Sequence, residues 1–156
     1  MTDVSVEVAS RLAFSYGSMM HTSEWLIWKE HDETVDLGKW NAYVDSFLVH
    51  ARRLHDVLAD NKKNDDDLVL SDLLDDPPHI ALPRTGEFRN RMNKRVLHLT
   101  THAEPEAVGW PVASIAKELG QAMDSVIEAM RTCGSDYYER FRDARDEKPG
   151  FRKLIM

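Results

Sequence analysis

Apolar side chains that recur every three or four residues constrain the fold of this chain more than any other feature. Between residues 38 and 60 the spacing is kept by Trp40, Tyr43, Val44, Phe47, Leu48, Ala51, Leu54 and Leu58. On a helix these positions share one face about 140° wide, which is typical of a helix that packs on a core. The pattern therefore predicts an amphipathic helix.

A second stretch with this spacing has both of its ends marked. Its apolar positions are Val112, Ile115, Ala116, Leu119, Met123, Val126, Ile127 and Met130. Pro111 suits the first turn of a helix, and Gly134 follows the last apolar residues as a helix terminator. We therefore expect a helix between Pro111 and Gly134.

Looser patterns indicate further helices. Residues 4–30 carry apolar residues along one side, with a bend allowed at Gly17, and residues 86–102 form a shorter helix. One or two helical turns are expected after residue 134. Residues 61–85 are acidic and are interrupted by two adjacent prolines, so they predict an irregular connection with a helical turn at Leu68–Leu74. The predicted fold class is all-α, a four-helix bundle of up to five helices, with one long acidic connection between helices 2 and 3.

The length of 156 residues fits one domain, which we expect over residues 1–135, followed by a C-terminal extension, 136–156, that is partly helical or mobile. The single cysteine, Cys133, excludes an intrachain disulfide framework and a cysteine-cage metal site. The apolar runs are too short to cross a membrane, and the first residues do not resemble a signal peptide. We expect a cytoplasmic protein without a cofactor.

Charge is distributed unevenly along the chain. Residues 56–76 contain eight acids and two lysines, whereas residues 84–95 contain five basic residues and only Glu87 as an acid. With a net charge of −7, the chain as a whole is a poor nucleic-acid binder, but the basic segment supplies the local positive potential that phosphate contacts require. RNA is therefore one expected partner.

The basic segment carries the strongest functional pattern. On a helix over 86–102, Phe88, Met92, Val96 and Leu99 form the buried stripe, and Arg91, Arg95, His98 and His102 form a second stripe beside it. Arginine supplies a fixed charge and bidentate contacts to phosphate, and histidine transfers protons near neutral pH. Arg91 and His98 lie about 10 Å apart along such a helix, so their side chains can converge on one phosphate.

The segment Arg91-x6-His98 resembles the R-x(4–6)-H motif of HEPN domains, all-helical proteins common in bacterial toxins and phage-defence ribonucleases. The resemblance implies a homodimer that cleaves RNA without metal. Arg91 and His98 would be its catalytic residues, and Arg95, His102 and Arg89 would bind the substrate phosphate. The preceding segment Phe47–Leu58 looks like the second helix of such bundles.

Two other interpretations of the same residues stay open. The arginines can be structural, paired with Asp56, Asp60 or Asp65–Asp67, in which case the chain is a non-catalytic interaction or adaptor module. The pair His98-x3-His102, together with His50, is also similar to the three-histidine site of DinB-like metal-binding bundles.

The sequence also indicates a protein partner. Trp25, Leu26, Ile27 and Trp28 are consecutive, so they cannot all face the core of one helix bundle. The excess apolar surface on the first helix suggests contact with another chain, most simply a second copy of this one.

Overall fold

The computed structural model describes residues 3–60, 62–97 and 109–146. They form the α-helices α1 (Asp3–Lys29), α2 (Leu37–Leu58), α3 (Pro83–Leu97), α4 (Val112–Cys133) and α5 (Tyr138–Asp146), and a short 3-10 helix, η1 (Leu70–Asp72). No β-strand occurs in the described ranges, which confirms the predicted all-α bundle. Within the same ranges, none of the helices is both long and apolar enough to cross a membrane.

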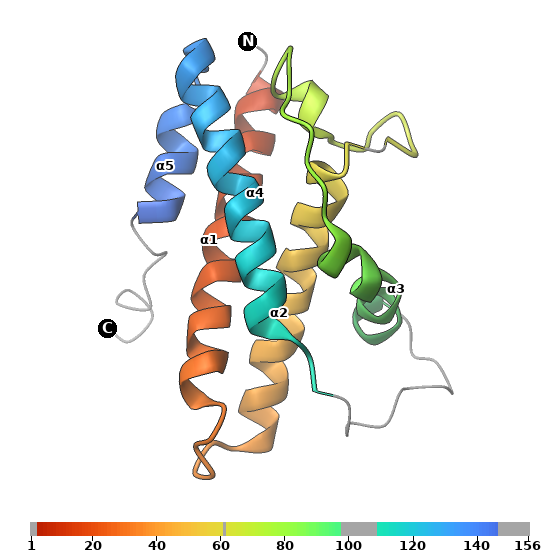
Figure 1. The fold of residues 1–156 in the computed structure, drawn as a ribbon, viewed down its shortest axis with the longest axis vertical. Helices are drawn as coiled ribbons and strands as arrows, with labels where there is room; N and C mark the ends of the chain where they lie inside the picture. The colour runs from red at the N-terminus through yellow and green to blue at the C-terminus, as the bar shows by residue number, and fades with distance from the viewer. Residues whose placement is uncertain (1–2, 61, 98–108, 147–156) are drawn as a thin grey trace.

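The three long helices form the frame of the molecule. Helices α2 and α4 run opposite to α1, and α5 turns back beside α1 and α4 (Figure 1). The large side chains buried among them are Tyr16, Met19, Leu26, Phe47, Leu48, Leu54, Ile115, Leu119 and Met123. These are the three- and four-spaced positions of the sequence, so the periodicity identified the core faces correctly.

Local signals set several helix ends. The Asp36 carboxylate accepts a hydrogen bond from the Lys39 N–H, 3.0 Å away, and so caps the start of α2. Gly134 has φ +67°, a left-handed conformation that suits glycine, and it ends α4 where the sequence predicted. Helix α1 continues through Gly17 without a break.

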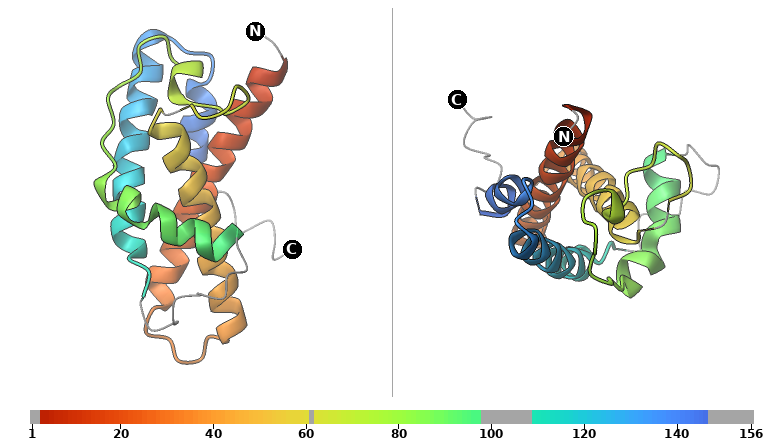
Figure 2. Two further views of the ribbon diagram at one scale, coloured as in Figure 1. Left: turned by 90° about the vertical axis from the view of Figure 1, so that its right-hand side faces the viewer. Right: turned by 90° about the horizontal axis from the view of Figure 1, so that it is seen from above.

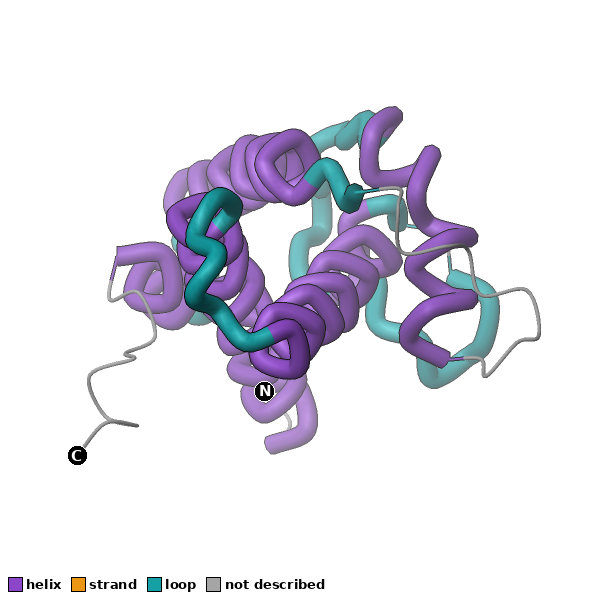
Figure 3. Tube along the Cα trace, turned by 90° about the horizontal axis from the view of Figure 1, so that it is seen from below, coloured by secondary structure: helices purple, strands orange, loops and turns teal. Residues whose placement is uncertain are grey.

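Helix α3 differs from the other helices in direction. It packs on α2 and α4 and runs across the long helices instead of along them (Figure 2). A view along the bundle shows it at the side opposite to α5 (Figure 3). It starts at Pro83, three residues before the predicted start, and its described part ends at Leu97, so Leu99 and the rest of the predicted helix lie outside the described residues.

The segment between α2 and α3 is irregular, as predicted, and contains η1 within the expected turn. Its buried side chains, Val69, Leu70, Leu73 and Leu74, cover one end of the bundle. Its acids build turns: Asp60 accepts from the N–H and hydroxyl of Ser71, both at 2.9 Å, and Asp67 accepts from the Asn64 N–H at the same distance. These contacts lie within the segment.

Helix α5 occupies the first part of the predicted extension. Phe141 is fully buried in the common core, and the Arg140 guanidinium donates to the Ser10 hydroxyl of α1, 2.7 Å away. The described part of this segment therefore shares the core of the long helices.

Candidate functional site on helix α3

Glu118 of α4 fixes the start of α3. One of its carboxylate oxygens accepts from the Arg84 N–H at 2.9 Å, and the other accepts from the N–H and hydroxyl of Thr85, each at 2.6 Å. The first N–H groups of a helix lack partners within the helix, and the positive end of the helix dipole favours a carboxylate. Thr85 is fully buried, so this cap lies inside the contact between α3 and α4.

Asp56 of α2 holds the next turn of α3. Its carboxylate lies 2.9 Å from Arg89 Nε, 3.5 Å from Arg52 Nε and 3.6 Å from His55 Nδ1. Burial acts to raise the pKa of Asp56, but His55, Arg89 and Arg52 outweigh it and leave that pKa below its ordinary value. With one carboxylate between two guanidinium groups, this group of side chains keeps a net positive charge.

Arg91 is seated on two aromatic rings. Its guanidinium carbon lies 4.6 Å from the centre of the Trp110 ring and 5.2 Å from the centre of the Phe88 ring. Trp110 precedes α4, so the contact joins α3 to the start of the next helix. Stacking engages the flat face of a guanidinium, while hydrogen bonds are made by N–H groups around its edge. The two rings are tilted 59° to each other, and together they restrict where the guanidinium can move.

The structure brings together only part of the predicted site. Arg89 and Arg91 lie on α3 with the contacts given above, and the exposed Lys94 follows them. Arg95 belongs to α3, but its side chain is outside the described part of the structure. His98 and His102 also lie outside the described residues, so the predicted convergence of arginine and histidine stays a prediction.

His50, the third histidine of the metal hypothesis, faces α1. Its ring meets the Phe14 ring edge-on, with 5.8 Å between the ring centres. Burial, with help from the charge of Arg53, lowers the pKa of His50. His50 and Arg52 are two residues apart and point about 160° away from each other around α2, so His50 is on the side remote from the Asp56–Arg89 contact. Across the described ranges no three acidic, histidine or cysteine side chains are grouped to hold a metal ion.

Sequence reasoning missed two residues that position α3. Glu118 lies between the core positions Ile115 and Leu119 of α4, and Trp110 stands before Pro111 outside any periodic stretch. The contacts of Glu118 cross more than 30 residues of sequence, and a periodic pattern carries no information about such a partner. Asp56, in contrast, was one of the acids that could pair with the arginines of the second stripe, and the structure places it beside Arg89, which is not part of that stripe.

Comparisons of this chain with protein-family models, with curated proteins and with solved structures give no match. The function therefore has to be inferred from the basic side chains of α3, Arg84, Arg89, Arg91 and Lys94, which we call the α3 face.

Proposed function

We propose that this protein is a HEPN-like ribonuclease that cleaves RNA without a metal ion and acts in the cytoplasm as part of a toxin or phage-defence system. Its site is the segment 89–102, in which Arg91 and His98 act on the scissile phosphate and Arg95 and His102 help to bind it. Arg89, about 160° from Arg91 around α3, helps to bind RNA from the flank beside α2. His98 takes the proton of the ribose 2′-hydroxyl, and the 2′-oxygen attacks the adjacent phosphorus. The bond from phosphorus to the 5′-oxygen breaks as that oxygen takes a proton from water. The products are a 2′,3′-cyclic phosphate and a 5′-hydroxyl.

The seat of Arg91 on Trp110 and Phe88 is the observation that carries this proposal. A long arginine side chain loses rotamer freedom when it binds a phosphate, and that loss weakens binding. Two aromatic rings that hold the guanidinium in advance reduce the loss. The planar guanidinium can also make bidentate contact with two phosphate oxygens, which an ammonium group cannot do.

The charge around α3 supports the same proposal. Asp56 takes up part of the charge of Arg89 and Arg52, while the exposed Arg84 and Lys94 extend the positive surface along the helix. The neighbouring segment 59–82 is acidic, but Asp60 and Asp67 are bonded within it. An RNA phosphate would therefore meet a local excess of positive charge on α3.

A homodimer is part of the proposal, because two α3 faces placed opposite each other would form one composite site. Light scattering after gel filtration should then give a mass of two chains at micromolar concentration. If the protein were a monomer and still cleaved RNA, a composite site would be excluded and a single α3 face would be sufficient for cleavage.

The Arg89–Asp56 ion pair favours a second candidate, a non-catalytic interaction module that uses the same helix bundle to bind another protein. In that case Arg89 serves to dock α3, and the basic face binds an acidic partner. The two candidates differ in whether RNA is cleaved.

Cleavage of labelled structured RNA, including tRNA, in excess EDTA tests the proposal. We expect cleavage by the wild type and loss of at least about 100-fold in rate for His98→Ala and for Arg91→Ala. Arg91→Lys keeps the charge but not the planar fork, so it should restore little. Arg53→Ala removes an exposed arginine of α2 as the matched control. Equal cleavage by all variants, or none by the wild type with its fold intact, would contradict the nuclease and favour the interaction module.

A further inference from the structure

The turn that joins α1 to α2 exposes apolar side chains at one end of the molecule. Trp28, at the end of α1, is 74% exposed, and Leu37, at the start of α2, is 64% exposed. Ile27, next to Trp28, is 47% exposed, whereas Leu26 is buried and the Trp25 ring stacks on Tyr43 with 3.9 Å between the ring centres. The excess apolar surface predicted for this part of α1 is therefore real, and it is concentrated at the turn.

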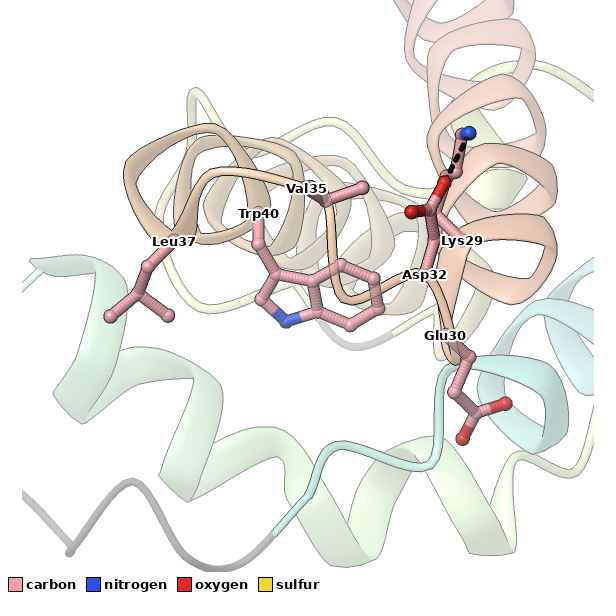
Figure 4. A pocket seen from close by; sticks show the side chains of 6 residues that line it. All are labelled: Lys29, Glu30, Asp32, Val35, Leu37 and Trp40. Carbon is pink, nitrogen blue, oxygen red and sulfur yellow. Dashed lines mark hydrogen bonds and ion pairs between the residues drawn. The ribbon is translucent and has the colours of Figure 1, made fainter.

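A hollow of about 210 Å³ lies at the same turn, lined by Lys29, Glu30, Asp32, Val35, Leu37 and Trp40. Leu37 and Glu30 stand on opposite sides of the Trp40 indole (Figure 4). The lining thus combines an aromatic ring, an exposed aliphatic side chain and a carboxylate. We call this hollow, with the adjoining Trp28, the tip surface.

The segment that carries the tip surface is acidic. Residues 24–39 contain five carboxylates, Glu24, Glu30, Asp32, Glu33 and Asp36, and two lysines, Lys29 and Lys39. Both lysines are directed at neighbouring side chains of this segment. Lys29 Nζ lies 2.6 Å from Asp32 and 4.0 Å from the centre of the Trp28 ring, and Lys39 Nζ lies 5.4 Å from that of Trp25. The exposed carboxylates of Glu30 and Glu33 give the rim its negative character.

We infer that the tip surface is a docking site for a partner protein, and that it binds a peptide segment that carries an arginine or lysine next to apolar residues. The cation would lie against the Trp40 ring beside the Glu30 carboxylate, and an apolar neighbour would cover Leu37. This surface is separate from the α3 face and does not depend on the proposed nuclease activity.

Charge complementarity favours a basic peptide over a second copy of this chain, RNA or a lipid surface. Two copies of this chain that met tip to tip would bring like charges together, which opposes a symmetric contact. The same carboxylates repel RNA and anionic lipid headgroups. A basic segment with apolar side chains satisfies both the charge and the exposed aromatic and aliphatic surface.

Fluorescence anisotropy with a designed peptide tests the inference. The probe is a labelled 14-residue amphipathic helix with leucine and arginine on adjacent faces, and its controls replace every arginine by glutamate or every leucine by serine. We expect one peptide to bind per chain. Leu37→Ser and Glu30→Gln should each weaken binding by about tenfold, equivalent to 1.4 kcal/mol. Asp136→Asn removes an exposed carboxylate from the turn between α4 and α5 and should have no effect.

Three outcomes would overturn the inference. If Asp136→Asn weakened peptide binding as much as Glu30→Gln does, binding would be explained by general attraction between charges. If Leu37→Ser bound the peptide as tightly as the wild type, the exposed apolar side chain would have no part in binding. A dimer of the free protein that Leu37→Ser dissociates would show that a second copy occupies the tip surface. RNA cleavage should be the same in Leu37→Ser as in the wild type, so failure here is distinguishable from failure of the nuclease proposal.

Discussion

Helices α3 and α5 are both short, and both pack on the frame of α1, α2 and α4, but different forces hold them. Helix α5 inserts Phe141, which is fully buried, into the core. Helix α3 buries Met92 and is in addition held by two carboxylates, Glu118 at its start and Asp56 along its side. One helix is attached mainly by apolar burial, and the other depends on charge and hydrogen bonds.

This difference matters because the two forces specify geometry differently. Apolar burial depends on area and tolerates small rotations of a helix. Carboxylate contacts have preferred distances and directions, so the contacts of Glu118 and Asp56 fix how α3 is rotated and therefore which side chains face outward. The position of Arg91 on Trp110 depends on that rotation. Variants that weaken the contacts of α5 and of α3 separately can test whether apolar burial holds one helix and carboxylate contacts hold the other.

The largest effect is expected for Phe141→Ala. Removal of a fully buried phenylalanine leaves a cavity, and we expect the free energy of unfolding to fall by about 3–5 kcal/mol. Urea denaturation followed by circular dichroism measures the change, and Glu139→Ala, on the exposed side of α5, is the control. A loss below about 1 kcal/mol would show that α5 contributes little to the core, although Phe141 is buried.

Glu118→Gln should have the next largest effect. The amide keeps one acceptor oxygen but turns an NH₂ group toward donors of Arg84 and Thr85, so we expect a loss of about 1–2 kcal/mol. Hydrogen exchange should become faster in α3 and stay unchanged in α5, and mass spectrometry of peptides from each helix can separate the two.

Glu128→Gln is the matched control for this prediction. Glu128 is 61% exposed and pairs with Arg131 one turn away on the surface of α4, so its substitution should leave the free energy of unfolding almost unchanged. If both substitutions have the same small effect, Glu118 does not anchor α3.

The sequence predicted the frame well because its signals are local. Periodic apolar positions and end signals such as Gly134 identified α2 and α4, and the buried residues agree with them. The start of α3 was placed three residues too late, although Pro83 carries the same local signal as Pro111. Its carboxylate cap could not be foreseen, because Glu118 lies more than 30 residues away in sequence. The direction of α3 was also beyond prediction, since a periodic pattern shows which face is buried but not at what angle the helix crosses its neighbours.

The candidate site was predicted in part. Arg91 was identified from its spacing, Arg89 was named only as an additional phosphate-binding residue, and Asp56 was one of several acids that could pair with arginines of this helix. Sequence alone did not select Asp56, because the choice depends on where α3 crosses α2. Trp110 gave no signal at all, since it stands outside the periodic stretches.

Asp56→Asn should weaken the side contact of α3 by about 0.5–1 kcal/mol, because the ion pair with Arg89 is partly exposed. The folded-state pKa of Asp56 is lowered, so its contribution is present above the unfolded-state value of 3.8 and is lost as the pH falls through the lowered pKa. The difference in unfolding free energy between wild type and variant should therefore shrink below pH 4. A constant difference down to pH 2 would show that the charge of Asp56 does not hold α3.

Titration of His50 should have the smallest effect on stability. It tests the contact between α1 and α2, which involves neither Asp56 nor Glu118. Burial and the charge of Arg53 lower the pKa of His50, so the folded protein binds a proton there less readily than the unfolded chain does. The stabilising contribution of neutral His50 is therefore complete above the unfolded-state pKa of 6.5, and it is lost as the pH falls from 6.5 through the lowered pKa.

We expect the wild type to lose stability relative to His50→Leu as the pH falls from 7.5 to 5.5, with an effect smaller than those of Phe141→Ala, Glu118→Gln and Asp56→Asn. The other histidines titrate in both proteins, so their contribution cancels in the difference in unfolding free energy between the wild type and His50→Leu. Hydrogen exchange should show faster opening near Phe14 and unchanged protection in α3, because Asp56 remains ionised in this range. Faster exchange in α3 between pH 7.5 and 5.5 would contradict this prediction. It would mean that the α1–α2 contact and the carboxylate contacts of α3 open together.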